Sequence, residues 1–162
     1  MNLDASPDCK TIIFDLLGDI YSIPITGGKA KVLRSEIPFE IQPRFSPDGK
    51  HVSFTSDAGG GDNIWVMKAD GSHAKQVTKK DFRLMNNACW MPDGNYLVVK
   101  KHFSSQRSPG AGEMWQYHNS GGSEVQLTKR KNDRQDVNEP LISPNGNYIY
   151  SIEDMLLKKC EV

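Results

Sequence analysis

The sequence predicts an all-β protein, a partial β-propeller of four-stranded antiparallel blades. A turn of the form Ser-Pro-Asp-Gly begins at Ser6, Ser46, Met91 and Ser143, with small variations and with spacings of 40, 45 and 52 residues. Each turn is accompanied by short apolar runs of strand length and by two further repeated signatures. A repeat of about 40–50 residues with four strands per unit is typical of a propeller blade.

The best-formed unit covers residues 41–78, where four short apolar runs are separated by three strong turn signals. In the first turn Pro47 presets φ, Asp48 caps the bend and Gly49 takes the left-handed position. Val52 and Phe54 then alternate with polar residues, as expected for a strand. Four strands joined by tight turns form an antiparallel meander. The predicted strands of this unit are 41–45, 51–55, 64–67 and 75–78.

Two more signatures follow each turn in a fixed order. The first is a polar, an aliphatic and an aromatic residue, at 19–21, 63–65 and 113–115, and the second is a glycine turn at 26–28, 69–72 and 119–122. The middle strands next to these signatures, such as 64–67 and 96–99, are apolar on both faces. Neighbouring blades would cover both of those faces. The fourth strand of a unit, such as 75–78, is more polar, as expected for an outer edge.

These signatures divide the single predicted domain, residues 1–162, into four segments. The first blade is 1–36, the second 37–81, the third 82–133, and 134–162 is an incomplete fourth, which gives about three and a half blades. The last residues, from Met155 to Val162, break the pattern and predict a shortened third strand or a helical turn. Closed propellers have about 4–8 blades, so we expect a fragment of a larger protein or association through open blade edges. Three and a half blades do not pair neatly into a two-copy ring.

The composition limits the kinds of partner. Lys and Arg total 20 and Asp and Glu total 20, so the formal net charge is zero and no global field attracts nucleic acid or an anionic membrane. No apolar run approaches the roughly 20 residues that cross a bilayer. We therefore expect no nucleic-acid partner and no membrane insertion. The three cysteines, Cys9, Cys89 and Cys160, are widely spaced and form no complete disulfide framework.

The sequence predicts no catalytic, cofactor-binding or metal-binding residue, and no cofactor. The four histidines form no pair with metal-ligand spacing, and the acidic glycine-rich loop 57–63 lacks the ligand order of a calcium site. No Gly-x-Ser-x-Gly elbow marks a nucleophile. The basic run 129–131 lacks an aromatic platform and is interpreted as a solvated inter-blade loop.

One long loop is the candidate contact site for a partner. It extends from His102 to Glu113 and contains Arg107, Pro109 and three small residues. Binding residues occur disproportionately on loops that a rigid scaffold positions. We therefore select His102, Arg107, Pro109 and Glu113 as candidate partner-contact residues.

The repeated turns and the two signatures that follow them resemble the TolB-like propeller repeat, and the resemblance extends from Ser6 to about Asp154. The segments 14–21, 56–65, 101–103 and 110–115 are most similar in look to the propeller that precedes a metal-dependent amidohydrolase domain in some bacterial proteins. The resemblance implies a non-catalytic scaffold that binds a protein or peptide, or flanks an attached hydrolase domain. It also implies a periplasmic location, although the N-terminus lacks the basic and apolar regions of a secretory signal.

Two other functions remain open. The chain could be part of a hydrolase that is active only at full length, or a self-assembling structural unit. The sequence also departs from the family at Cys9, which replaces the glycine of the first turn. A left-handed Cys costs on the order of 1 kcal/mol, and we expect that turn to be distorted or frayed.

Overall fold

The computed structural model describes residues 1–79, 84–103, 111–129, 131, 137–153 and 156–161. All regular secondary structure in these residues is β-strand, in three four-stranded sheets and one three-stranded sheet. Every strand pair is antiparallel, and strand order within each sheet follows the chain. The prediction of an all-β partial propeller is confirmed.

The strands have the following bounds. The first sheet contains β1 (Leu3–Ala5), β2 (Thr11–Leu16), β3 (Asp19–Pro24) and β4 (Lys31–Arg34). The second contains β5 (Glu40–Phe45), β6 (His51–Ser56), β7 (Asn63–Lys68) and β8 (Lys75–Gln76). The third contains β9 (Met85–Trp90), β10 (Tyr96–His102), β11 (Gly112–His118) and β12 (Glu124–Gln126). The fourth contains β13 (Val137–Ile142), β14 (Tyr148–Glu153) and β15 (Leu156–Glu161).

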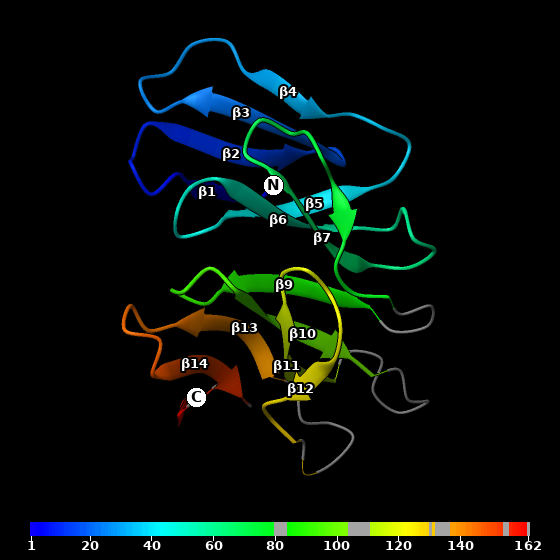
Figure 1. Cartoon of the computed structure of the whole chain (residues 1–162), viewed down its shortest axis with the longest axis vertical. Coiled ribbons are helices and arrows are strands. Elements are labelled where there is room, and N and C mark those ends of the chain that lie inside the picture. Colours follow the sequence, from blue (N-terminus) through cyan, green and yellow to red (C-terminus); the bar gives the residue numbers. More distant parts are fainter. Residues whose placement is uncertain (80–83, 104–110, 130, 132–136, 154–155, 162) are drawn as a thin grey trace.

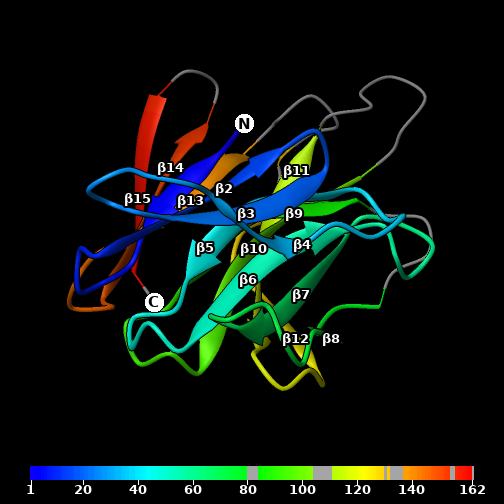
Figure 2. The same cartoon turned by 90° about the horizontal axis from the view of Figure 1, so that it is seen from above.

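The four sheets follow one another along the long axis of the molecule, from β1–β4 at the top of Figure 1 to β13–β15 at the bottom. Seen from above, successive sheets overlap (Figure 2). The first strand of each sheet contacts the first strand of the next, from β1 through β5 and β9 to β13. The C-terminal strand β15 pairs with β14 along its whole length. Of the two conformations expected for the tail, the third strand is therefore the one formed.

Apolar side chains fill each junction between sheets. Val52 and Phe54 of β6 face the first sheet, while Ile64 and Val66 of β7 face the third. Because the middle strands of the second and third sheets have a neighbouring sheet on both sides, they carry buried side chains on both faces. The buried side chains are Ile13, Ile20, Phe45, Val52, Phe54 and Met67 between sheets one and two, and Ile64, Val66, Val77, Met85, Leu97, Val99 and Tyr117 between sheets two and three. Met91, Val98, Met114 and Ile149 lie between sheets three and four.

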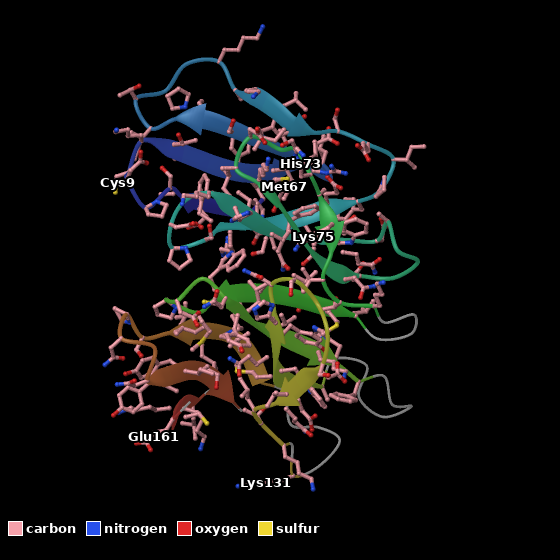
Figure 3. The ribbon with its side chains drawn as sticks, viewed as in Figure 1. Cys9, Met67, His73, Lys75, Lys131 and Glu161 are labelled. Atoms are coloured by element: carbon pink, nitrogen blue, oxygen red, sulfur yellow. The ribbon has the colours of Figure 1, made fainter. Side chains whose placement is uncertain are left out.

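The repeated turns share one hydrogen-bond pattern, and the first turn keeps it. The N–H of Gly49 donates to the carbonyl of Ser46 at 2.8 Å, and the N–H of Cys9 donates to the carbonyl of Ser6 at the same distance. Cys9 has φ 56°, in the left-handed region that Gly49 occupies with φ 70°. The expected distortion of the first turn is therefore wrong. The turn is intact because its other hydrogen bonds hold it, and Cys9, at the surface (Figure 3), carries the strain itself.

Replacing Cys9 by Gly is expected to raise the free energy of unfolding by about 1 kcal/mol, because Gly adopts positive φ without a Cβ clash. Urea denaturation would measure the change. Gly94→Ala is the matched control, since Gly94 has φ 70° and a Cβ added there would meet nothing within 4 Å. It should lose a similar amount through backbone strain alone. A Cys9→Gly variant less stable than the parent would contradict the assignment of strain to this turn.

Backbone N–H groups of β5 and β9, the first strands of the second and third sheets, bond to side chains of the sheet before them. A bulge in β5 places Gln42 at φ 58°, and its N–H donates to Oδ2 of Asp15 in β2 at 2.9 Å. The N–H of Asn87, at φ 53° in β9, donates in turn to Oε1 of Gln42 at 3.0 Å. The N–H of Phe45 donates to Oδ2 of Asp4 at 2.8 Å. These bonds satisfy buried donors that the bulged ladders leave unpaired.

Candidate functional site

A groove of about 660 Å³ lies between the outer parts of the second and third sheets. One wall is the segment that follows β7 and includes β8. The other wall is the turn between β11 and β12. The groove is lined by Gln76, Val77, Thr78, Lys79, Tyr117, Ser120, Gly121, Gly122, Ser123 and Glu124.

Thr78 fixes the first wall. Its side chain is buried, and its Oγ1 donates to Oδ1 of Asn63 at 2.9 Å and accepts the N–H of Ile64 at 2.9 Å. The N–H of Val77 also bonds to the carbonyl of Ile64 at 2.9 Å. Because β8 has only two residues, these bonds extend the attachment of this segment to β7 beyond the regular ladder.

Glu124 dominates the electrostatics of the second wall. Its Oε1 accepts a hydrogen bond from Nζ of Lys101 at 2.7 Å, and its Oε2 accepts one from the hydroxyl of Tyr117. The side chain of Lys101 is only 3% exposed, and its Nζ lies 3.8 Å from the centroid of the Trp115 ring. A buried ammonium needs both a carboxylate and a polarisable neighbour to offset its desolvation. The carboxylate of Glu124 is therefore held in place at the groove.

The corresponding turn of the second sheet lies closer to the first sheet. There the equivalent turn brings Gly71 so close that an added Cβ would lie 2.7 Å from the carbonyl oxygen of Leu33. At Gly121 an added Cβ would lie 3.4 Å from the carbonyl oxygen of Val77. The turn between β11 and β12 thus stands further from its neighbour, which leaves room for the groove.

The lining combines both signs of charge with neutral hydrogen-bonding groups. Lys79 supplies a cation, Glu124 supplies carboxylate oxygens whose charge is balanced by Lys101, and Ser120 and Ser123 supply hydroxyl groups that both donate and accept. The volume lies within the range of about 300–1,000 Å³ that is usual for ligand sites. This set of groups suits a polar ligand that has several hydrogen-bonding groups.

A sequence profile described as the TolB beta propeller domain matches residues 4–159, almost the whole chain. The chain belongs to the TolB β-propeller family. The structure is similar to a TolB structure from Agrobacterium tumefaciens, with a TM-score of 0.80 at 19% identity, over 98% of this chain and 57% of that one. It is also similar to TolB from Acinetobacter baumannii, with a TM-score of 0.70 at 25% identity, over 93% of this chain and 37% of that one.

Among curated proteins, tricorn protease homolog 1 of Streptomyces coelicolor is 29% identical over 97 residues. The match covers 59% of this TolB-family chain and 9% of the protease homologue. This TolB-family chain therefore spans only a small part of that relative, and little more than half of the Agrobacterium TolB chain.

The two ends of the loop predicted to contact a partner, His102 and Glu113, lie in β10 and β11 of this TolB-family propeller. His102 is half-buried, and its Nε2 lies 3.0 Å from Oδ1 of Asn86. Glu113 is 5% exposed and accepts a hydrogen bond from Nε2 of Gln126 at 2.8 Å. Arg107 and Pro109 lie outside the described residues. The loop remains a prediction, and the structure adds the groove as a second candidate in this TolB-family chain.

The acidic loop 57–63 is hydrogen-bonded to the backbone of a neighbouring segment through Asp57. Oδ1 of Asp57 accepts the N–H of Phe39 at 2.8 Å, and burial together with the charge of Asp57 raises the pKa of Asp62. In the described part of this TolB-family chain, no three His, Cys, Asp or Glu residues gather as a metal site would require. The described residues also contain no helix that is long and apolar enough to cross a membrane.

The sequence did not mark the groove residues, because the groove arises from the spacing of two sheets. Lys101 and Glu124 are 23 residues apart, and nothing local to either residue predicts their contact. The Ser-Gly-Gly-Ser run at 120–123 is the sequence feature that could have indicated the groove. It shows where the turn of this TolB-family propeller presents hydroxyl and backbone groups without bulky side chains.

Proposed function

We propose that this chain is a non-catalytic TolB-like scaffold that binds a protein or peptide segment in the groove between its second and third sheets. The blades are residues 1–36, 37–81, 82–133 and an incomplete 134–162. In a larger protein the propeller flanks a hydrolase domain, and the loop from His102 to Glu113 contacts the partner or that domain.

The groove is the observation that carries the binding proposal. Its two walls are fixed by hydrogen bonds to the sheets behind them, through Thr78 on one side and Glu124 on the other. A site whose polar groups are already held in position loses little conformational entropy on binding. The exposed cation of Lys79 and the hydroxyl groups of Ser120 and Ser123 favour a polar ligand with hydrogen-bonding groups.

The protease homologue supports the association with a hydrolase. Its match to this chain occupies 9% of its length, so the similarity concerns a small module of a much larger protein named as a protease. Resemblance in the loops supports an amidohydrolase as the attached domain. The second candidate function, a hydrolase fragment active only at full length, draws on the same match. Hydrolase assays of the chain alone, with and without zinc, test the scaffold proposal, since chelator-sensitive activity of the chain alone would defeat it.

Filling the groove is expected to weaken peptide binding by about tenfold or more, because a large side chain removes the volume that a ligand would occupy. The variant is Ser123→Trp, since Ser123 is exposed and lines the groove. Peptides selected on the parent protein from a random dodecamer phage library serve as probes, and fluorescence anisotropy measures their Kd.

Ser35→Trp is the control for this experiment, because Ser35 is exposed and lies outside the groove. It should leave the Kd of the selected peptides unchanged. Thermal unfolding checks that both variants keep the stability of the parent. If the selected peptides bind the Ser123→Trp variant as tightly as the parent, or if selection on the parent enriches no peptide, the groove is not the binding site.

A further inference from the structure

A pocket of about 350 Å³ lies between the first and second sheets, and we name it the first-junction pocket. The first sheet contributes the β1–β2 turn and parts of β3 and β4 to its lining. The second sheet contributes the end of β5, the β5–β6 turn and the β7–β8 turn. Figure 1 shows the β1–β2 and β5–β6 turns together at the left edge of the molecule. The residues that line this pocket are all different from those that line the groove.

Two close contacts between the sheets bound the first-junction pocket. At the inner turns, a Cβ added to Gly49 would lie 3.4 Å from Cδ of Pro7, so the two turns touch. At the outer strand β4, a Cβ added to Gly71 would lie 2.7 Å from the carbonyl oxygen of Leu33. Pro7, Gly49 and Leu33 all line the pocket. Because both contacts join neighbouring sheets inside the chain, the pocket does not depend on an open end of the sheet stack.

The pocket exists because Ser22 stands where the next junction has an apolar side chain. Ser22 of β3 pairs with Lys31, and Val66 of β7 pairs with Lys75, so the two residues hold the same repeat position. Val66 is 3% exposed and packs between the second and third sheets. Ser22 is smaller and polar, and it lines the pocket. Unfilled space forfeits van der Waals contacts, and natural proteins break packing rules chiefly at functional or strained sites.

The pocket is apolar inside and negatively charged at its opening. Phe45 is 9% exposed, and Leu33 packs against the same core cluster. The side chains of Asp8, Asp48 and Asp70 are exposed, so they form the rim of the pocket. These three carboxylates outnumber the one lysine of the lining.

The rim carboxylates are ionised and only weakly paired. A serine hydroxyl two residues earlier donates to Asp8 and to Asp48, and it lowers the pKa of both carboxyl groups. Nζ of Lys10 lies 3.8 Å from Oδ2 of Asp8, and Nζ of Lys50 lies 3.7 Å from Oδ2 of Asp48. These lysines are 80% and 78% exposed, and such exposed pairs are weak and screened by salt. A ligand cation therefore competes with them easily.

We propose that the first-junction pocket binds an arginine side chain of a peptide or protein. The alkyl stem lies against Leu33 and Phe45, and the guanidinium group lies between the rim carboxylates of Asp8 and Asp48. Long basic side chains bury their methylene groups while the charged end stays in polar surroundings. A guanidinium group also donates two parallel hydrogen bonds to a carboxylate. The volume is at the lower end of the usual range of about 300–1,000 Å³, which suits one long side chain. This site is independent of the proposed peptide groove.

The test titrates the 162-residue chain with the tripeptide acetyl-Gly-Arg-Gly-amide and follows backbone amide shifts by NMR. We expect a Kd on the order of 1 mM, with the largest shifts in the turns that line the pocket. The same peptide with citrulline, which is neutral and has nearly the same shape, should bind about tenfold more weakly. Propylguanidinium, the same cation without a peptide, should also bind more weakly. An equal Kd for propylguanidinium would assign the pocket to a free small cation and overturn the assignment to a peptide.

Two variants test the residues of the pocket. Asp8→Asn removes one rim charge and should raise the Kd about threefold, while Ser22→Leu fills the pocket and should raise it about tenfold or more. Asparagine keeps the turn, since Asn145 holds this position in the fourth sheet and accepts the N–H of Asn147 at 3.1 Å. Asp93→Asn is the matched control, because Asp93 accepts the equivalent bond in the third sheet and lies outside the pocket. It should leave the Kd unchanged.

Ser123→Trp separates this pocket from the groove, because Ser123 lines only the groove. This variant should bind the tripeptide as the parent does, whatever its effect on the peptides selected for the groove. Loss of tripeptide binding in Ser123→Trp would place the arginine in the groove and overturn the proposal. So would the absence of a saturable shift at about 10 mM tripeptide, equal Kd values for the arginine and citrulline peptides, or a Kd that Asp8→Asn and Ser22→Leu both leave unchanged. Thermal unfolding checks that each variant keeps the fold.

Discussion

Replacing Arg34 by Leu is expected to lower the free energy of unfolding by about 3–5 kcal/mol at pH 7, because it leaves a buried carboxylate without its cation. The side chain of Glu40 is 1% exposed, and Oε2 lies 2.8 Å from Nε of Arg34. Nε also bonds to Oε1 at 2.9 Å. The pair joins the end of β4 in the first sheet to the start of β5 in the second. Its loss therefore weakens a junction between sheets.

The loss should depend on pH in a definite direction. Burial raises the pKa of Glu40 above its usual value, and the hydrogen bond and charge of Arg34 oppose that rise. A carboxyl whose pKa is raised in the folded state contributes stability at low pH and loses it as the pH rises through the folded-state pKa. Without Arg34 the pKa of Glu40 rises further. Urea denaturation at pH 4, 5.5 and 7 should show a small loss at pH 4 that grows toward pH 7.

Lys50→Leu is the control for the buried pair. Nζ of Lys50 lies 3.7 Å from Oδ2 of Asp48, and the two side chains are 78% and 51% exposed. An exposed pair of this kind contributes about 0–1 kcal/mol, so the variant should differ little from the parent at any of the three pH values. A loss in the Arg34→Leu variant that is the same at pH 4 and pH 7 would show that ionisation of Glu40 is not its cause.

Phe54→Ala is expected to lower the free energy of unfolding by about 3–5 kcal/mol, through lost burial and a cavity between the first two sheets. Phe54 is 0% exposed and packs in one cluster with Ile13 and Met67. Its ring lies 6.5 Å from that of Trp65, and the guanidinium of Arg34 lies 5.7 Å from its centroid. Urea denaturation would measure the loss. Hydrogen exchange should show that β2 and β3 lose protection more than β10 and β11, because Phe54 supports the first sheet.

Phe39→Ala removes the same ring from the surface and serves as the control. Phe39 is 54% exposed, and its ring lies against Gly18. The Phe39→Ala substitution should lower the free energy of unfolding by about 1 kcal/mol or less. Equal losses at the two positions would mean that the junction between the first two sheets is not closely packed around Phe54.

The fold was predictable because its signals are local and repeated. Pro47 and Gly49 each dictate backbone angles within one turn, and the same turn recurs in every sheet. Strand alternation then sets which side chains enter the core, so that Phe54 and Ile64 were expected between sheets. The repeat also gave the number of sheets.

The candidate site was not predictable in the same way, because it depends on contacts between distant residues. The bond from Lys101 to Glu124 and the spacing of Gly121 from Val77 exist only once two sheets have packed. Cys9 shows a different limit. Its steric strain was correctly anticipated, but the remaining hydrogen bonds of the turn outweigh a strain of about 1 kcal/mol.

The hydrogen bonds that β5 and β9 make to the preceding sheet all run in one direction, with the donor in the later sheet and the acceptor in the earlier one. Gln42 and Asn87 each donate a backbone N–H to a side chain of the preceding sheet. The first and second sheets therefore each present a side-chain acceptor to the sheet that follows. A ribosome makes the acceptors first, so a newly synthesised inner strand meets a surface that already matches its unpaired donors. Separating two neighbouring sheets would expose the donors of one and the acceptors of the other to water, so these bonds form only when the sheets pack together.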